Sequence, residues 1–514
     1  MKRALINFRA FFVVALSVTA AVFCCYIYSI KCVAGIVTGC AIILLLACAS
    51  TVFVIGCKRG KFRLRLPIAF CMSLALSACA FGFGVSVVDE WNESARYDGY
   101  FYVTGRVTAV DLRSGEYRLN LENITLDGRP TGGMLRLSFE TGEHSAADFV
   151  RCGDVLGFGA NVQAVRLTEN GKVNGTAFRT DIRYNAKTSI EIVAMKPGKA
   201  TPMESFMNNW RDFYVENMGD KYGNIAFSIL TGDKLALDYE ITSYFSAAGL
   251  GHILAVSGLH VGFMALILGF MLKKLSKKVR YPIILAALIA YCAIADFSPS
   301  VTRALIMAVI SGIGIMIGGR RDLLSSLLCA YSLILAVKPF YMFEAGFLFS
   351  FASIFGIALF SDSFKRKLIK HGVHDRVGNA LGASASVTLS VFPAGSYLVG
   401  YINPISLITN AVLLPYVSVV FISIVCLTPI ALIPGCGVLL VAPKYMLVAL
   451  DYIAMGIASI PYSVIPLKTR GAVFLCYPVM FFASEFVMYP KKCTVAARVY
   501  SAATCIAIMG LCAL

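Results

Sequence analysis

The chain has 514 residues, of which 58% are hydrophobic and 15% are charged, and this balance excludes an ordinary soluble domain. The formal net charge of +17 would suit a nucleic-acid partner, but the polar insert at residues 89–200 contains nearly equal numbers of basic and acidic residues. The surplus lies in the apolar regions, where an excess of Lys and Arg in cytoplasmic loops explains it. The 17 cysteines do not indicate a disulfide framework, because only Cys152 lies in the insert. The composition predicts a polytopic α-helical membrane protein.

Residues 1–88 are predicted to form an N-terminal three-helix membrane region. A basic start precedes an apolar run to Ile30, and no small-residue cleavage site clearly follows, so we interpret this run as a retained helix and not as a signal peptide. Two more apolar runs follow at residues 33–57 and 67–88. The basic cluster at residues 58–65 marks the cytoplasmic side. We therefore expect a cytoplasmic N-terminus and a third helix that leads outward.

The insert at residues 89–200 is predicted to be an extracytoplasmic, β-rich domain of the OB-like type. Turn signals such as Asp127-Gly128 separate its alternating runs. The predicted strands cover residues 100–110, 116–126, 134–139, 155–167 and 189–194. Five short strands in about 100 residues fit a small barrel. Such barrels often bind oligonucleotides or oligosaccharides, but the insert has no net positive charge and no evident aromatic ladder, so DNA contact and a spacer role both stay open.

Residues 201–249 are predicted to form amphipathic helices at the outer interface, because aromatic and acidic side chains fall on opposite sides. The next apolar run ends at Leu272 and meets a basic cluster at residues 273–280, so it should enter from outside and exit in the cytoplasm. Later runs cover residues 281–295, 301–318, 323–337, 341–360, 377–399, 405–434, 438–460, 471–488 and 494–514. With the N-terminal region they predict about 12 to 13 transmembrane helices, several of them short for a bilayer.

The most unusual stretch is residues 249–263, GLGHILAVSGLHVGF, at the start of an apolar run. It contains His252 and His260, and the whole chain has only 5 histidines. Polar groups at membrane depth are costly and by default indicate function. Ser257 and several glycines, Gly258 among them, interrupt the hydrophobic pattern. They predict irregular backbone beside a cavity or another helix.

Charged residues in the apolar runs are further candidates. Arg303 either pairs with an acid such as Asp296 or Glu344, or donates to phosphate, and the two roles are compatible. Glu344 otherwise reaches water near the outer face. Asp451 and Glu485 are weaker buried-acid candidates. These acids would also suit proton or cation coupling in a secondary transporter, which is the alternative function.

Enzyme signatures are mostly absent, and we expect the chain not to be an enzyme. It has no Cys-x-x-Cys and no His-Glu-x-x-His pattern, so neither a metal nor another cofactor is expected. A remote alternative is an intramembrane serine hydrolase resembling rhomboids, with Ser257 near His252 and His260. In such enzymes, however, serine and histidine come from different helices, and the Gly-x-Ser-Gly pattern fails at Ala255.

Residues 250–260, LGHILAVSGLH, resemble the signature of the ComEC-type competence proteins, the inner-membrane channels for DNA uptake. Other segments match in order, namely LTGD at 230–233, SPSVTRA at 298–304, GRRD at 319–322, GF and SF within 346–351, and NPIS at 403–406. The resemblance covers residues 67–460. It implies a competence-type membrane domain at residues 250–460, followed by C-terminal transmembrane helices at residues 461–514.

The resemblance further implies a channel in the cytoplasmic membrane that takes up single-stranded DNA in natural transformation. The residues that would line the DNA pathway or pack its helices are His252, Ser257, Gly258, His260, Arg303 and Glu344. Besides DNA and the lipid bilayer, the expected partners are a DNA receptor, a separate nuclease and a cytoplasmic ATPase, because no Walker A pattern is present. An oligomer is compatible with this role.

Two departures from the family pattern qualify these expectations. Many members continue into a metallo-β-lactamase-like domain, whereas this chain ends at Leu514, so nuclease activity is not expected. Leu348 stands where the family often has glutamine, and Glu344 stands where it often has aspartate. The match is therefore incomplete in that segment.

Overall fold

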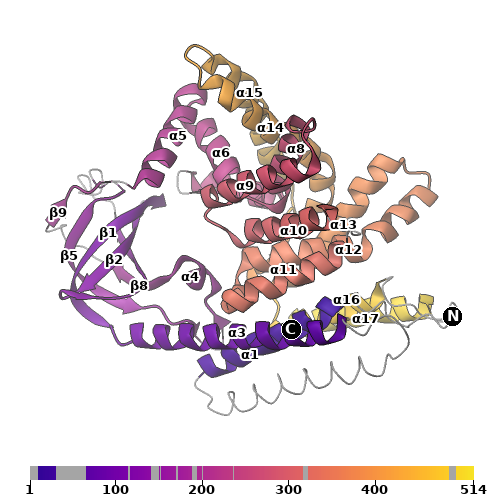
Figure 1. Ribbon diagram of the computed structural model, residues 1–514, viewed down its shortest axis with the longest axis horizontal. Coiled ribbons are helices and arrows are strands. Elements are labelled where there is room, and N and C mark those ends of the chain that lie inside the picture. The colour runs from indigo at the N-terminus through magenta and orange to yellow at the C-terminus, as the bar shows by residue number, and fades with distance from the viewer. Residues whose placement is uncertain are drawn as a thin grey trace.

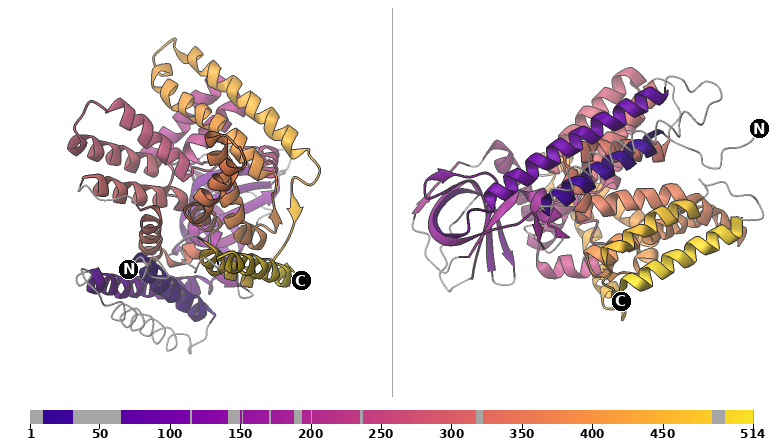
Figure 2. Two further views of the ribbon diagram at one scale, coloured as in Figure 1. Left: turned by 90° about the vertical axis from the view of Figure 1, so that its right-hand side faces the viewer. Right: turned by 90° about the horizontal axis from the view of Figure 1, so that it is seen from below.

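The computed structural model describes residues 10–30, 65–113, 116–140, 150, 152–169, 172–187, 194–199, 201–234, 237–316, 322–484 and 494–513. They form a bundle of helices with a β-barrel at one end (Figure 1). The helices α1 (Ala10–Ser29) and α3 (Arg65–Ser94) lie side by side and run from the barrel along the bundle, as a second view also shows (Figure 2). The span predicted at residues 33–57 lies outside the described residues.

The described residues include five helices that are long and apolar enough to cross a membrane. Four of these spans are α3, α10 (Pro299–Met316), α12 (Ala345–Lys370) and α14 (Ser406–Ala431), and the fifth combines η3 (Gly437–Leu440) with α15 (Val441–Ala458). The other long helices of the bundle are α8 (Gly258–Met271), α9 (Lys277–Ile294), α11 (Leu323–Val337), α13 (Asp375–Leu398) and α17 (Thr494–Ala513), and α16 (Cys476–Ala483) is shorter. The predicted class of multi-pass helical membrane protein is confirmed, while the total of 12 to 13 spans stays a prediction.

The insert contains a closed barrel of five strands. In order around the barrel they are β1 (Gly99–Arg113), β2 (Glu116–Leu126), β4 (Met134–Glu140), β8 (Ile182–Lys187) and β5 (Val155–Ala164). The circuit closes because β1 pairs with both β2 and β5. Only β4 and β8 run parallel, and the other pairs of the circuit are antiparallel. Alternate residues of each strand fill the interior, as the period of two along a strand requires.

The sequence pattern predicts four of the barrel strands and misses the fifth. The strand that completes the circuit is β8, whereas the pattern predicts residues 189–194, most of which lie outside the described residues. Only the first residue of β9 (Ala194–Lys196) falls in that range. The β8 segment contains Asn185 and Ala186, which are weak strand formers, and burial of Tyr184 in the barrel core decides its conformation.

The barrel is attached to the bundle on two sides. Arg183 of β8 pairs with Glu90 of α3 at 2.9 Å. The short helix α4 (Gly175–Thr180) packs against the 3-10 helix η2 (Pro339–Phe343) that precedes α12. A Cβ on the first residue of α4 would lie 2.5 Å from the carbonyl oxygen of the last residue of η2, so this contact requires glycine.

A third attachment joins the barrel to α5 (Pro202–Met218). Arg106 of β1 pairs with Glu122 of β2 and with Glu204 of α5, both at 2.5 Å. Glu204 also accepts the backbone N–H of Thr201 at 2.7 Å, which completes a capping box at the start of α5. Burial disfavours the carboxylate, but the hydrogen bonds from Thr201 and Arg106 outweigh it, so the pKa of Glu204 lies below its usual value.

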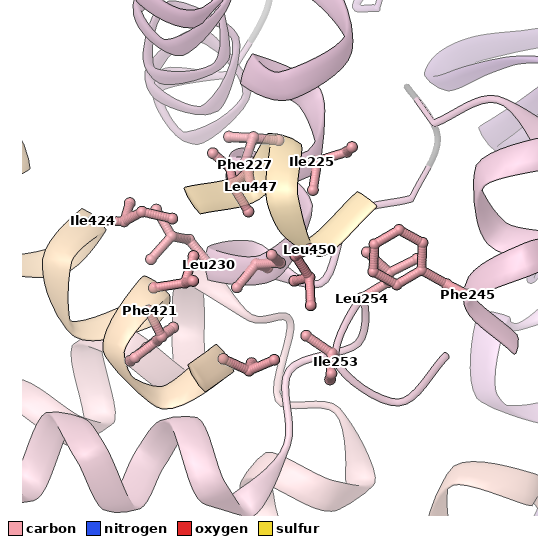
Figure 3. Packing of buried hydrophobic residues seen from close by; sticks show 14 of the residues in the cluster. Ile225, Phe227, Leu230, Phe245, Ile253, Leu254, Phe421, Ile424, Leu447 and Leu450 are labelled. Carbon is pink, nitrogen blue, oxygen red and sulfur yellow. The ribbon is translucent and has the colours of Figure 1, made fainter. Parts of the chain in front are cut away.

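The helices α5, α6 (Asp220–Thr231) and α7 (Tyr239–Ala247) occupy the region predicted as amphipathic. Every residue of α6 from Ile225 to the end of the helix is buried, and the predicted position at the outer interface stays a prediction. Figure 3 shows Phe227 of α6 packed in one cluster with residues of α14 and α15. These two helices therefore cover the apolar half of α6.

Small residues let α12 and α13 approach closely along their length. A Cβ at Gly356 of α12 would overlap the backbone carbonyl oxygen of Ser386 and lie 2.6 Å from the Cβ of Ser390 on α13. Ser386 and Ser390 are themselves fully buried. Helices in a membrane gain little from the hydrophobic effect when they associate, because lipid is as apolar as their side chains. Small residues allow the close van der Waals packing that holds them together instead.

The α12–α13 contact predicts opposite effects for two Gly→Ala substitutions. Gly356→Ala should lower the free energy of unfolding by about 1–3 kcal/mol, because the added methyl group overpacks the interface. Gly262→Ala in α8 is the matched control: a Cβ there meets no atom within 4 Å, so the higher helix propensity of alanine should stabilise by up to about 1 kcal/mol. Thermal unfolding of the two proteins in detergent measures the difference, and equal melting temperatures would contradict the packing described.

The Glu204 contacts predict a local loss of stability in acid. The pKa of Glu204 is lower in the folded state than in the unfolded state. The contribution of Glu204 to stability is therefore fully present above the usual glutamate pKa of about 4.3, and it is lost as the pH falls through the pKa of the folded state. The protection factor for hydrogen exchange in the first turn of α5, taken relative to the intrinsic rate at each pH, should therefore fall below about pH 4. In Glu204→Gln this protection factor should be lower at neutral pH and should not fall further on acidification; a pH dependence equal to that of the unsubstituted protein would assign the effect to another group.

Candidate functional site

The unusual stretch at residues 249–263 forms a turn that leads into α8. Gly249 has φ +78°, and a Cβ there would lie 2.6 Å from the Cβ of Ser406, so both the conformation and the space require glycine. Asn403, just before α14, donates to the last carbonyl groups of α7, at 2.7 Å to that of Ala247. The NPIS segment therefore holds the end of α7 and the turn toward α8.

Ser257 and His260 cap the start of α8 reciprocally. The hydroxyl oxygen of Ser257 accepts the backbone N–H of Leu259 at 3.3 Å, and the backbone N–H of Ser257 donates to Nδ1 of His260 at 3.1 Å. Histidine here occupies the place that Glu or Gln has in a usual capping box. The imidazole thus holds the backbone of Ser257 and not its hydroxyl group.

The two histidines of the stretch lie in different environments. His260 is 1% exposed, and its ring stacks on Phe421 of α14 with 4.6 Å between the centroids and 26° between the planes. His252, in the turn before α8, is exposed. His260 therefore joins α8 to α14, whereas His252 is accessible.

Arg303 of α10 reaches both α8 and α12. Its side chain is buried, its Nη1 donates to the backbone carbonyl of Ser350, and its guanidinium carbon lies 5.9 Å from the ring centre of Phe351. A Cβ at Gly258 would overlap its Nη2, so the guanidinium lies against the first residue of α8. In the part of the chain that the structure describes, no carboxylate pairs with Arg303, and its Nε is buried without a hydrogen-bond partner.

Glu344 is not the partner of Arg303. Its side chain accepts the backbone N–H of Phe347 at 2.6 Å and so caps the start of α12. It also pairs with Arg179 of α4 at 3.6 Å. Asp296, the other acid predicted to pair with Arg303, is exposed. Neither Asp296 nor Glu344 therefore pairs with Arg303, and Glu344 instead links the barrel's helix α4 to the bundle.

The remaining predicted acids are Asp451 and Glu485. Asp451 of α15 is buried and pairs with Lys221 of α6 at 2.7 Å. It also accepts hydrogen bonds from the hydroxyl groups of Tyr222, at 3.5 Å, and Tyr244 of α7. This carboxylate therefore fastens α6 and α7 to α15. Glu485 lies outside the described residues.

The structure brings four predicted residues together where α8, α10 and α12 meet, namely Ser257, Gly258, His260 and Arg303. The sequence does not predict two further groups in this arrangement, namely the backbone carbonyl of Ser350 and the ring of Phe421. No pattern identifies a backbone carbonyl or one phenylalanine among many as a partner. Among the described residues, no group of three or more His, Cys, Asp or Glu side chains could hold a metal ion.

The chain is thus a multi-pass helical membrane protein with a β-barrel insert and a buried polar contact at the start of α8. Residues 229–492 match the model of the Competence protein family, and the chain belongs to this family. The chain is 27% identical over 194 residues to ComE operon protein 3 of Bacillus subtilis, and this alignment covers 37% of the chain and 24% of that protein. It is 27% identical over 219 residues to an uncharacterized protein of Aquifex aeolicus, and this alignment covers 41% of the chain and 49% of that protein. The matches thus span less than half of each curated relative, and no solved structure matches.

The reciprocal cap predicts graded effects at His260. His260→Ala removes both the acceptor for Ser257 and the stack on Phe421, and should lower the free energy of unfolding by about 2–4 kcal/mol. His260→Gln keeps an acceptor at the capping-box position and should lose about half as much. His371→Ala, at an exposed loop histidine, is the control. Thermal unfolding and abundance in membranes measure the series; an unaltered His260→Ala protein would show that neither contact stabilises the fold.

Proposed function

We propose that this protein conducts a single strand of DNA inward across the cytoplasmic membrane during natural transformation. Its family membership and its similarity to ComE operon protein 3 support a role in competence. The matched segment is only part of each chain, so the proposed role as a DNA channel depends also on the charges in the membrane region.

The observation that carries the proposal is an unpaired buried cation. Glu344 and Asp451 each have a basic partner, whereas Arg303 has no carboxylate partner among the described residues. A route for phosphates needs donors and positive charge, since a bare phosphate cannot enter hydrocarbon. A guanidinium supplies both in a geometry that matches phosphate oxygens. This balance favours an anionic cargo over a proton or a metal cation.

The start of α8 adds to the same contact. A helix N-terminus carries partial positive charge and unsatisfied N–H groups, which favour phosphate. Gly258 leaves room for the guanidinium of Arg303 directly beside this end. We propose that Arg303, Ser257 and the exposed His252 contact the strand when the route opens, and that His260 and Glu344 pack the helices that form it.

We also propose that the barrel is OB-like and extracytoplasmic, with the N-terminus in the cytoplasm. A closed circuit of five strands with a single parallel pair supports the first point. The basic clusters at residues 58–65 and 273–280 support the second, because cytoplasmic loops carry the excess of Lys and Arg. The predicted domain limits are part of this proposal.

The two alternative functions have less support. A serine hydrolase would need the hydroxyl of Ser257 to donate to an imidazole, whereas His260 accepts the backbone N–H. We therefore propose that the protein is not an enzyme. Of the acids that would suit a cation-coupled transporter, Glu344 and Asp451 each pair with a basic side chain and Asp296 is exposed. A deletion strain that transforms normally but has lost a solute phenotype would favour the transporter.

We expect the driving force and the removal of the second strand to come from separate proteins. The sequence contains no Walker A pattern, so a cytoplasmic ATPase would have to pull the strand. A DNA receptor and a nuclease complete the proposed set of partners.

Substitution of Arg303 tests the channel. Arg303→Gln removes the charge and should lower uptake of labelled DNA by at least about 100-fold, because the route then lacks its buried cation. Arg303→Lys keeps the charge without the planar fork and should show an intermediate loss. Lys278→Gln is the control, since it removes an exposed cation near the start of α9.

Abundance and melting temperature of each variant in isolated membranes separate transport from folding. Normal transformation by Arg303→Gln at normal abundance would remove Arg303 from the pathway and, with it, the main support for the proposal.

A further inference from the structure

Three cysteines meet where the last two helices, α16 and α17, pack side by side (Figure 1). Cys476 is the first residue of α16, and Cys505 and Cys512 lie on α17. Cys476 and Cys512 are buried in one hydrophobic cluster, and Cys505 packs against it. All three are free thiols in the structure. The sequence offers no reason to group them, because they come from separate apolar runs.

The side chains of Cys476 and Cys505 cross each other. Sγ of Cys476 lies 3.8 Å from the carbonyl oxygen of Cys505, and Sγ of Cys505 lies 3.9 Å from the carbonyl oxygen of Cys476. The two thiols also hydrogen-bond each other. A disulfide needs the two Cβ atoms to be about 3.8 Å apart. Two side chains that each reach the backbone of the other are close to this arrangement, so a bond between them requires only a small movement.

This pair lies in the contact that attaches the last helix to the bundle. α17 packs on α16 and on the 3-10 helix η4 (Gly471–Leu475), which leads into α16. The N–H of Arg470 donates to the carbonyl oxygen of Cys512 at 3.0 Å, near the end of α17. Apolar side chains of the cluster fill the contact between these points. A covalent bond here would therefore hold α17 on the bundle.

The contact lies at the end of the bundle where the turn toward α8 begins. Two short strands, β10 (Tyr401–Ile402) and β11 (Ile465–Pro466), pair there. Asn403 directly follows β10 and holds the end of α7. The chain runs on from β11 through the exposed Arg470 into η4 and α16. The proposed orientation places this end outside the cytoplasm, where disulfides form and persist.

We propose that Cys476 and Cys505 form a disulfide bond that fixes α17 to α16. The oxidant is an external disulfide, either a small molecule or a disulfide oxidoreductase outside the cytoplasm. The inference rests on the proposed orientation of the chain for its access to this oxidant, but it does not depend on the conduction of DNA.

The bond forms by two thiol–disulfide exchanges. Cys505 is the more exposed of the two thiols and attacks first, as its thiolate, on one sulfur of the external disulfide. That S–S bond breaks, a mixed disulfide forms on Cys505, and one thiol leaves. Cys476 then attacks the sulfur of Cys505, and the second thiol leaves. The two cysteine protons pass to the two leaving thiolates, and the external disulfide accepts the two electrons that the cysteines lose.

Treatment of the full-length protein with dithiodipyridine, an apolar disulfide that enters detergent micelles, tests the pair. Peptide mapping by mass spectrometry without reductant should find two peptides joined through Cys476 and Cys505, and dithiothreitol should separate them. The melting temperature of the oxidised protein should exceed that of the reduced protein by at least about 2 °C. The reason is that a link between residues 29 positions apart restricts the unfolded chain.

Serine variants assign the bond. Cys476→Ser and Cys505→Ser should each abolish the joined peptides and the rise in melting temperature on oxidation. Each rise is measured against the reduced form of the same variant, so a lower stability of the variant itself does not obscure it. Cys329→Ser, at a half-buried cysteine of α11, is the matched control and should retain both effects. Cys512→Ser should retain them too. A protein without joined peptides, or with Cys512 in the bond, overturns the proposal.

The state of the pair in cells tests the orientation separately. Protein whose free thiols are trapped by alkylation before lysis should already contain the joined peptides. Reduced thiols in cells, together with a bond that forms in detergent, would count against the proposed orientation alone. Arg303→Gln should form the bond to the same extent as the unsubstituted protein, so its uptake of DNA tests conduction independently of the disulfide.

Discussion

The structure depends on one constraint, that a polar group in the apolar interior must find its partner within the protein. The start of α8 meets it through the reciprocal cap of Ser257 and His260. Asp451 meets it with a lysine and two tyrosine hydroxyl groups. Arg303 meets it only in part, because one nitrogen donates to a helix carbonyl while its Nε has no partner among the described residues. Burying a guanidinium with an unpaired N–H costs free energy, and this cost suggests that Arg303 has a functional role.

The same constraint explains how the barrel is held. Glu344 caps α12 and pairs with Arg179 of the barrel region, so this acid joins two parts of the molecule. Arg183 and Arg106 make comparable contacts with α3 and α5. These three ion pairs join the barrel region to α3, to α5 and to the start of α12.

Sequence periodicity predicted most elements because it reports burial directly. The apolar run at residues 323–337 coincides with α11, and the alternating run at residues 116–126 coincides with β2. The pattern fails where tertiary contacts override propensity. The strand β8 contains weak strand formers and forms because Tyr184 enters the barrel core.

The sequence by itself determined the class of protein, the order of its elements and the stretch at residues 249–263, because hydrophobicity, glycine and rare polar residues are local properties. It also singled out Arg303 as a candidate. Only the tertiary structure decided which partners these residues have. Pairing depends on distances between segments far apart in the chain, and so the structure alone assigns Glu344 to Arg179 and leaves Arg303 with a backbone carbonyl. The barrel likewise closes only because β1 pairs with both β2 and β5, which are separated in the chain.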